Sequence, residues 1–378
     1  MTRHVIVHQF DPTRHVAGGI AGYIRDLIEH GGEDHDFAVV GVEKRGKGML
    51  GRWRTVDIGG RSIEFMPVAH MEAGNQQRFI PHSFRLAYGL LRYRPRLDDA
   101  IIHNHRPELG AVTSVIFPKA RRVQFIHDDA LEAFSWRKET MWRFFPRVFQ
   151  LFERRAVSTA ERALVMRSST LSRVGRHSST AVMGANWYDA RYFHTTGRRS
   201  RSGSRPRIGW AGRFEPPKDP LTAVGVFAEL RARGVEFEAW MAGAGTLSQD
   251  VRTAVDAAGL GGIVRLPGVL SPAELADEFR QSDLFLMTSR WEGIPRAAIE
   301  ARACGVPVVS TAVGELPAMI TDGVNGFVSS SRSVGDIAAT VEQGLTLTPG
   351  ESIAVTVADL EVGLIVPKLL NQVAGGRG

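Results

Sequence analysis

Arg213 and Lys218 are the first residues whose types and spacing could do chemistry. They stand in "GRFEPPKDP" (212–220), directly after an apolar run, where Gly212 lets the chain turn sharply. Arginine offers a planar fork of donors and lysine a compact charge, so together they could hold a diphosphate. A helix starting near Pro220 would add partial positive charge. The alternative is two exposed cations without a ligand, and the position after a glycine turn makes the two interpretations equally good.

Glu292 and Glu300 lie in "SRWEGIPRAAIEARA" (289–303), which separates two apolar runs. The expected order of strand, loop, helix and strand puts Glu292 in the loop and Glu300 on the helix. Gly293 permits an unusual backbone conformation, and Pro295 fits the first helical position, which leaves amides free for an anion. Glu300 could accept hydrogen bonds from a ribose pair, and Glu292 could accept them from a sugar. The alternative is surface salt bridges, with Arg290, Arg296 and Arg302 as candidate partners.

Two glycine-rich turns also follow expected strands. In "MAGAGTL" (241–247), Gly243 belongs to a lone G-x-G, for which a phosphate-binding turn and close strand–helix packing are equally good explanations. In "HVAGGIAGYIRDLI" (15–28), Gly18 and Gly19 would let the backbone approach a ligand at the first helix. This segment is not G-x-G-x-x-G, and no acid is clearly placed for a dinucleotide ribose, which disfavours a dehydrogenase.

Three histidines, His103, His105 and His127, stand at expected strand ends in "IIHNH" and "FIHDD". His127 with Asp128 could hold a substrate hydroxyl or a developing charge. Because neither segment has a known zinc-ligand spacing, no metal site is predicted.

Aromatic residues alternate with Arg and Lys in "FSWRKETMWRFFPRVFQLFERR" (134–155). Such a segment could touch anionic lipid or a lipid-linked acceptor at a membrane surface. A core-facing helix with a basic outer face is the simpler interpretation, and we favour it. Pro146 would break any single long helix here.

The scaffold that must position these residues is predicted to be α/β. Each half of the chain alternates short β-rich runs with helical stretches, which is typical of doubly wound parallel sheets. Ligands of such sheets bind at the carboxyl ends of the strands, so two facing domains would form a cleft. We expect residues 1–195 to form one domain, 196–206 a basic linker, 207–350 a second domain, and 351–378 a C-terminal segment that could return to the first. In that segment, Pro367 is expected to interrupt a helix.

Composition sets the outer limits. A chain of 378 residues suits two domains, and 43% hydrophobic with 23% charged residues is ordinary for a globular protein. The single cysteine, Cys304, excludes an intrachain disulfide and fits a reducing compartment. No apolar run approaches the ~18 residues that span a bilayer, and the N-terminus lacks a signal-peptide pattern. We therefore expect a cytoplasmic protein, which could also contact the inner face of the membrane.

The net charge of +7 favours anionic partners, whether nucleic acid, a membrane surface or phosphorylated small molecules. Part of it is local, because "RRSRSGSRPR" (198–207) holds five arginines among Ser, Gly and Pro. We interpret this segment as a solvated connector. No nucleic-acid motif accompanies it, so no nucleic-acid partner is predicted.

The order of "GRFEPPKDP", "MAGAGTL", "LFLMTSRWEGIPRAAIEARACGVPVVST" and "ITDGVNGFV" resembles that of family-four retaining glycosyltransferases of the GT-B fold. The resemblance is close over about residues 207–345. In the first half it is looser, and rests on "AGGI", "FIHDD", "FERRAVSTAERALVMRSS" and "NWYDARYF". It implies two Rossmann-like domains facing across a cleft, a nucleotide-sugar donor that is UDP- or GDP-linked, no cofactor and no obligatory metal. The acceptor would be a glycan, a lipid-linked molecule or a small molecule.

The resemblance also implies roles for single residues. Arg213 and Lys218 would stabilise the departing diphosphate. Glu292 would contact donor-sugar hydroxyls, helped by the backbone of Gly293 and Ile294. Glu300 would hold the nucleotide ribose, Gly19 would lie near the phosphates, and His127 near the sugar or acceptor.

Two departures from the family pattern qualify this. The usual G-G-x-x-E appears here as "GELPA", so Glu315 replaces the second glycine and Ala318 the glutamate. Glu315 would set a carboxylate near the expected phosphates and weaken or alter donor binding. Trp187 also replaces the glycine of a usual N-G-x-D turn before Asp189. Two alternatives therefore stay open, a nucleotide-sugar 2-epimerase and a non-catalytic nucleotide-sugar-binding protein.

Overall fold

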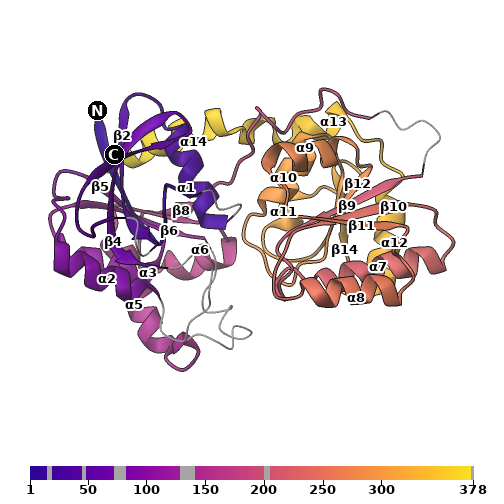
Figure 1. The fold of residues 1–378 in the computed structure, drawn as a ribbon, viewed down its shortest axis with the longest axis horizontal. Coiled ribbons are helices and arrows are strands. Elements are labelled where there is room, and N and C mark those ends of the chain that lie inside the picture. The colour runs from indigo at the N-terminus through magenta and orange to yellow at the C-terminus, as the bar shows by residue number, and fades with distance from the viewer. Residues whose placement is uncertain (15–18, 45–47, 72–81, 128–140, 200–204, 376–378) are drawn as a thin grey trace. The chain divides into compact units, whose positions relative to one another are not determined.

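The computed structural model describes residues 1–378 apart from 15–18, 45–47, 72–81, 128–140, 200–204 and 376–378 (Figure 1). Gly18, Asp128 and half of the basic connector 198–207 lie outside the described residues, so the predictions made for them are not taken further. Among the described residues, no helix has the length and apolar character needed to cross a bilayer.

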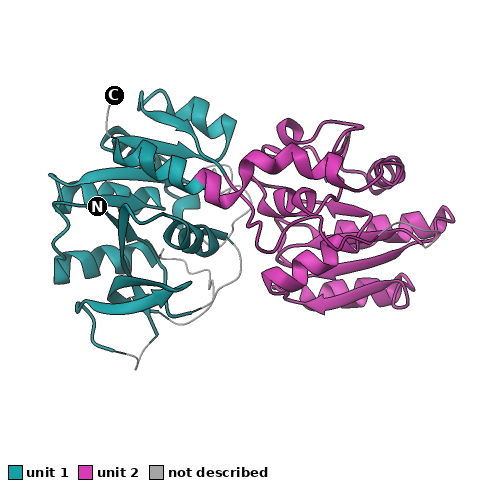
Figure 2. Cartoon of the chain, turned by 90° about the horizontal axis from the view of Figure 1, so that it is seen from above, with its two compact units in different colours: residues 1–185, 366–378 teal, residues 186–365 magenta. Residues whose placement is uncertain are grey.

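The chain divides into two compact units, shown in different colours in Figure 2. Unit 1 consists of residues 1–185 and 366–378, and unit 2 of residues 186–365. Each unit contains one sheet, with strand order β3-β4-β2-β1-β5-β6-β7-β8 in unit 1 and β11-β10-β9-β12-β13-β14 in unit 2. The predicted α/β class with two parallel sheets is confirmed.

The sheet of unit 1 is parallel except for the antiparallel hairpin between β3 and β4, which was not predicted from the sequence. Gly59 and Gly60 make that turn with positive φ of 58° and 82°. Its strands are β1 (Thr2–Val7), β2 (His35–Glu43), β3 (Arg54–Ile58), β4 (Arg61–His70), β5 (Ile101–Asn104), β6 (Arg121–Ile126), β7 (Arg162–Val165) and β8 (Ala181–Met183).

Helices cover both faces of this sheet (Figure 1). Val5 and Val7 of β1 pack with Leu86 of α2 and Leu109 of α3, on the face opposite to His4. The helical segments are α1 (Gly19–Glu29), α2 (His82–Tyr93), α3 (Pro107–Ile116), η1 (Met141–Arg143), α5 (Pro146–Ser158) and α6 (Ser168–Val174). As expected, Pro146 prevents one long helix, because α5 begins there.

Unit 2 has a fully parallel sheet whose central strands are buried on both faces. Leu284 and Leu286 of β12 join one core layer, while Phe285 and Met287 join the other, as the strand period of two requires. The strands are β9 (Arg207–Ala211), β10 (Glu238–Ala242), β11 (Val264–Gly268), β12 (Leu284–Met287), β13 (Val308–Thr311) and β14 (Gly326–Ser329). The helical segments are α7 (Pro220–Ala232), α8 (Ser248–Ala257), α9 (Pro272–Arg280), α10 (Arg296–Ala303), α11 (Leu316–Met319), α12 (Val334–Gly344), α13 (Glu351–Ala354) and η2 (Val355–Leu360).

The boundary between the units falls at 185/186, ten residues before the predicted end of the first domain at 195. Residues 186–195 belong to unit 2 because their aromatic side chains pack there. Phe193 is buried in the core layer that contains Trp240 and Phe285, and Tyr192 packs against the same layer.

The C-terminal segment is shared between the units. Val357 is buried in the core of unit 2, whereas α14 (Val362–Ala374) passes into unit 1 from residue 366 onward. There the Arg121 guanidinium donates to the carbonyls of Val373 and Ala374, at 3.3 and 3.0 Å. The expected interruption is wrong, because α14 runs through Pro367. Proline has no N–H, so the helix loses one backbone bond at that point without ending.

Candidate active site

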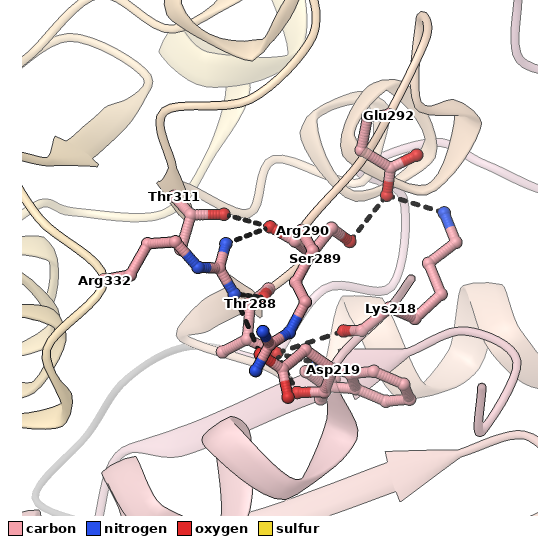
Figure 3. A network of polar contacts seen from close by, with 9 residues as sticks. Lys218, Asp219, Thr288, Ser289, Arg290, Glu292, Thr311 and Arg332 are labelled. Atoms are coloured by element: carbon pink, nitrogen blue, oxygen red, sulfur yellow. Dashed lines mark hydrogen bonds and ion pairs between the residues drawn. The ribbon is translucent and has the colours of Figure 1, made fainter. Parts of the chain in front are cut away.

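The site is formed by loops at the carboxyl edge of the sheet of unit 2, where the strands are parallel and therefore end together. Residues 212–219 follow β9, residues 288–295 follow β12, and Arg332 follows β14. Figure 3 shows the side chains of these loops in one network of hydrogen bonds and ion pairs. The fold therefore brings together loops that are more than 100 residues apart along the chain.

Lys218 and Glu292 form the ion pair at the centre of this site (Figure 3). Lys218 Nζ lies 2.6 Å from Glu292 Oε1, and the Ser289 hydroxyl donates to the same oxygen at 2.6 Å. The Glu292 side chain is 6% exposed and that of Lys218 is 26% exposed. The carboxylate is thus held by two donors, while the ammonium keeps access to solvent. The salt-bridge alternative named arginines as partners of Glu292, and it was wrong about the partner.

Asp219 is the second centre of the network, although no role was predicted for it from the sequence. It sits at the N-cap of α7 with φ of 48°, and the Nε of Arg290 and a terminal nitrogen of Arg332 each donate to its Oδ2 at 2.8 Å. Arg332 also donates to the carbonyls of Ser289 and Thr288, at 2.6 and 3.1 Å. Asp219 and Arg332 therefore tie the loops after β9, β12 and β14 together.

A position before a proline-started helix was the only signal for Asp219, and it indicates an N-cap without revealing the two arginines. Arg332 had no sequence signal at all, since it follows a run of serines in "GFVSSSRS".

Arg213 is on the same edge but apart from that network. Its side chain is exposed, and it has no hydrogen bond or ion pair to any residue that the structure describes. Gly212 places it, because the Gly212 N–H donates to the Ala242 carbonyl at 3.0 Å and so ties the turn to the end of β10. An exposed guanidinium at a fixed turn can take up an anion without first breaking an internal ion pair.

A side chain at Gly243 or Gly314 would clash with a neighbouring backbone carbonyl. A Cβ on Gly243 would lie 1.8 Å from the Gly212 carbonyl oxygen, and one on Gly314 would lie 2.4 Å from that of Glu292. Both have positive φ, 143° and 58°. Close packing therefore explains Gly243, which the sequence left open between packing and phosphate binding. Glu315 donates its backbone N–H to the Gly293 carbonyl at 3.2 Å, which places this departure from the family pattern beside the Glu292 loop.

Helix α10 carries Glu300 and begins beside the same loop. Pro295 is its N-cap, with φ of −77° and ψ of 115°, so the prediction that it takes the first helical position was off by one residue. No side chain caps this end among the described residues, and Asn186 fixes the preceding turn by donating to the Ile294 carbonyl at 2.7 Å. Glu300 is buried, with Oε1 3.5 Å from Arg296 Nε, as the salt-bridge alternative allowed.

His127 and Gly19 belong to unit 1. His127 Nε2 lies 2.8 Å from Nδ1 of the buried His105, and its ring stands edge-on to Tyr23. Burial lowers the pKa of His105, which is therefore neutral. Its Nε2 has no hydrogen-bond partner among the described residues. The contact between His105 and His127 is a hydrogen bond in which one ring nitrogen donates and the other accepts. Gly19 is exposed at the start of α1, with φ of 62°.

No cluster of three or more His, Cys, Asp or Glu side chains suited to a metal ion occurs in the described parts of the chain. In unit 2, the groups that the sequence predicted to bind a ligand are the cations Arg213 and Lys218, the carboxylates Glu292 and Glu300, and the start of α10.

Comparison with known families places the segment that holds this site. Residues 198–352 match the family described as Glycosyl transferases group 1. The match covers less than half of the chain, and we call residues 198–352 the group 1 segment. The group 1 segment contains all of Arg213, Lys218, Asp219, Glu292 and Glu300.

D-inositol 3-phosphate glycosyltransferases of Mycobacterium bovis and Mycobacterium tuberculosis are similar to part of this chain. They are 34% identical over 145 residues, which are 38% of this chain and 30% of the relative. The matched part thus spans under a third of the length of these curated relatives.

Solved structures show the same fold over the whole chain. Sucrose-phosphate synthase of Thermosynechococcus elongatus superimposes with a TM-score of 0.79 at 16% identity, covering 99% of this chain and 100% of that one. Anabaena HepE in complex with UDP-glucose gives a TM-score of 0.70 at 15% identity, covering 98% and 99%. The fold is GT-B, as the resemblance implied.

Proposed function

We propose that this protein is a retaining glycosyltransferase, which moves a sugar from a nucleotide-sugar donor to a glycan, lipid-linked or small-molecule acceptor. The observation that carries the proposal is the Lys218–Glu292 pair, with Arg213 on the same carboxyl edge of the sheet, within the group 1 segment. A diphosphate needs cations and a sugar needs hydrogen-bond acceptors, and this edge offers both.

The ion pair supports a division of roles. Ser289 holds Glu292 through Oε1, so this carboxylate keeps its place when Lys218 turns toward a phosphate. Its other oxygen, Oε2, can then accept hydrogen bonds from sugar hydroxyls. Before a donor binds, the pair neutralises two charges that would otherwise be costly in a largely buried place.

The chemistry follows from where charge develops. As the glycosidic bond breaks, negative charge grows on the leaving phosphate, and cations already held in place stabilise it without reorganisation. We assign that role to Arg213 and Lys218, the ribose to Glu300, and the donor phosphates also to the amides at the start of α10. No metal ion is required in this scheme, so activity should survive a chelator. The roles expected of Gly19 and His127 stay predictions.

We propose a UDP-linked donor first, because Anabaena HepE, which shares the fold, was solved with UDP-glucose, and a GDP-linked donor second. The test is a thermal-shift screen with UDP, GDP, ADP and their sugars. A ligand at 100 times its dissociation constant adds about 2.7 kcal/mol to the free energy of unfolding. If none of these nucleotides and nucleotide sugars raised the unfolding temperature, the result would contradict the proposal.

Turnover separates the proposal from its alternatives. If release of nucleoside diphosphate requires an acceptor, the protein is a transferase. If the donor sugar is converted when no acceptor is present, the 2-epimerase is indicated. Binding without turnover across a broad panel of acceptors would indicate the binding protein, for which Glu315 beside the Glu292 loop is the motivating observation. The anomeric configuration of the product, determined by NMR, tests retention.

A further inference from the structure

Unit 1 exposes a row of large apolar side chains on two helical segments. On α2, Phe84, Tyr88 and Leu91 recur at helical spacing and are 38%, 70% and 51% exposed. Around the start of α5, the row consists of Phe144, Phe145, Val148 and Leu151, which are 43–65% exposed. Clusters of this size are uncommon on a surface that meets only water.

Trp142 of η1 connects the two rows. Its ring centroid lies 5.8 Å from that of Phe84 on α2, and it also contacts the rings of Phe149 and Phe152 on α5. Its Nε1–H donates to Glu108 of α3 at 3.0 Å. Helices α2, α3 and α5 lie together on one side of the sheet (Figure 1). We call this surface of α2, η1 and α5 the apolar–basic face.

The charges on the apolar–basic face are all of one sign. Helices α2, α3, α5 and η1 contain only two acids, Glu108 and Glu153, and both are buried. Glu108 accepts from Trp142, and Glu153 is paired with Arg173. The exposed charged residues of α2, η1 and α5 are therefore arginines, among them Arg85, Arg92, Arg143, Arg147 and Arg154.

We propose that the apolar–basic face binds the surface of an anionic lipid bilayer. The simpler interpretation of the sequence gave α5 a purely basic outer face, but the structure gives it an outer face that is apolar as well. Such a helix gains from placing its apolar side chains at the boundary between headgroups and acyl chains, with arginines reaching anionic headgroups. Each arginine near the surface of an anionic membrane adds about fivefold to binding.

A lipid surface fits these side chains better than a nucleic acid does. Leu91, Val148 and Leu151 are aliphatic and cannot stack on bases, which is what aromatic residues do in single-strand binding. A second copy of this chain would bring the same arginines against each other without exposed acids to neutralise them. The proposal does not depend on the function proposed for unit 2.

The test measures sedimentation of the full chain with vesicles of phosphatidylcholine alone or with about one-third phosphatidylglycerol, at roughly 0.05 and 0.5 M salt. We expect binding to the anionic vesicles only, weakened at the higher salt. The double variant Val148→Glu, Leu151→Glu should lose at least about tenfold in partition, since two charges replace the apolar contact. Arg147→Ala and Arg154→Ala should each lose about fivefold.

Matched controls lie in unit 2. Val269→Glu with Val324→Glu replaces two exposed valines, and Arg252→Ala removes an exposed arginine, so neither should change vesicle binding. All variants should keep the circular dichroism and the nucleotide-induced thermal shift of the parent chain, which shows that they fold.

Three results would overturn the proposal. One is equal binding of the parent chain to neutral and anionic vesicles, or to neither. Another is unchanged binding in both kinds of face variant. The third is a parent chain that does not bind vesicles but forms a complex with an oligonucleotide, or a dimer detected by light scattering, which the face variants fail to form. That result would assign the face to a different partner.

Discussion

The two units share one plan, parallel strands between helical layers, but they differ in which polar side chains they hold and in where they hold them. In unit 1, His4 of β1 lies between His103 of β5 and His35 of β2, with ring nitrogens 2.8 and 2.9 Å apart. In unit 2, the polar groups are Lys218, Asp219, Glu292 and Arg332, and they stand at the edge of the sheet.

The difference shows what each environment can hold. An imidazole can be buried in its neutral form, and burial accordingly lowers the pKa of His4 to about 3 and that of His103 well below its usual range. Ammonium, guanidinium and carboxylate groups would stay charged and would be costly in the same place unless paired. The charged site therefore forms at the loop end of the sheet, where solvent and a ligand can reach it.

Among these predictions, Arg213→Ala should have the largest effect, and it tests the charged site of unit 2. If this exposed cation stabilises the leaving diphosphate, turnover should fall roughly 10²- to 10³-fold. The free energy of unfolding should stay unchanged, because the side chain has no partner among the described residues. The measurement is kcat with the donor identified in the thermal-shift screen. Arg252→Ala, on α8 of the same unit, is the control and should be fully active. Full turnover in Arg213→Ala would remove the assignment.

Acid should unfold unit 1 before unit 2. A histidine whose folded pKa is below that of the unfolded chain takes up its proton only on unfolding. Its contribution to stability is therefore full above pH ~6.5 and is lost as the pH falls toward the folded value. For His4, with a folded pKa of about 3, this costs on the order of 3 kcal/mol at pH 4. His103 and His105 act in the same direction.

Hydrogen exchange at decreasing pH, followed by peptide mass spectrometry, locates the effect. Exchange rates need correction for their intrinsic dependence on pH, and peptides of β1 and β5 should then lose protection before those of β9 and β12. Eleven of the twelve histidines precede residue 186, and His194 is the exception, so unit 2 serves as the internal control. Simultaneous loss of protection in both units would contradict the expectation.

Asp219→Asn should have a smaller effect, confined to unit 2. Asparagine keeps the shape and tolerates the left-handed backbone at this position, but it removes the charge that both arginines share. Because Arg290 and Arg332 are 64% and 37% exposed, the loss in free energy of unfolding should be only about 1–2 kcal/mol. Urea unfolding measures it, with Asp250→Asn on α8 as an exposed control. The donor affinity should fall as well, since the loops after β9, β12 and β14 lose their common anchor.

Sequence patterns predicted the parts of the molecule that depend on local chemistry. The alternation of strands and helices in unit 2, the helix start at Pro220, and the loop position of Glu292 all follow from periodicity and from glycine or proline signals. The hairpin β3–β4 was missed because one of its strands, "RTVDI", has only two apolar residues among polar ones.

Side-chain partners could not be predicted in the same way. Nothing in the sequence pairs Lys218 with Glu292 across 74 positions, or Asp219 with Arg332 across 113, because the fold brings their loops together. The buried histidine contacts have the same origin, since three adjacent strands each supply one ring. The first domain was predicted to end at 195 because the basic connector is the clearest change in composition there. Phe193 precedes the connector but is already buried in the core of unit 2.

Ser271→Ala should have the smallest effect, and it compares the two units by the N-terminal capping of single helices. In unit 2, α9 starts with a complete capping box, in which Ser271 Oγ accepts from the Glu274 N–H and the Glu274 carboxylate accepts from the Ser271 N–H. In unit 1, α3 and α5 have no side-chain hydrogen bond at their N-caps.

Losing the Ser271 hydroxyl removes one partner of the first-turn amides, so the Tm of unit 2 should fall by about 2–4 °C in scanning calorimetry. Ser271→Thr keeps a hydroxyl and should restore most of this loss. If both variants lose equally, the stabilisation does not come from capping, because threonine can accept the same hydrogen bond. In α3, the side chain of the N-cap residue Arg106 makes no capping hydrogen bond. Arg106→Ala should therefore cause no loss of Tm through capping in unit 1.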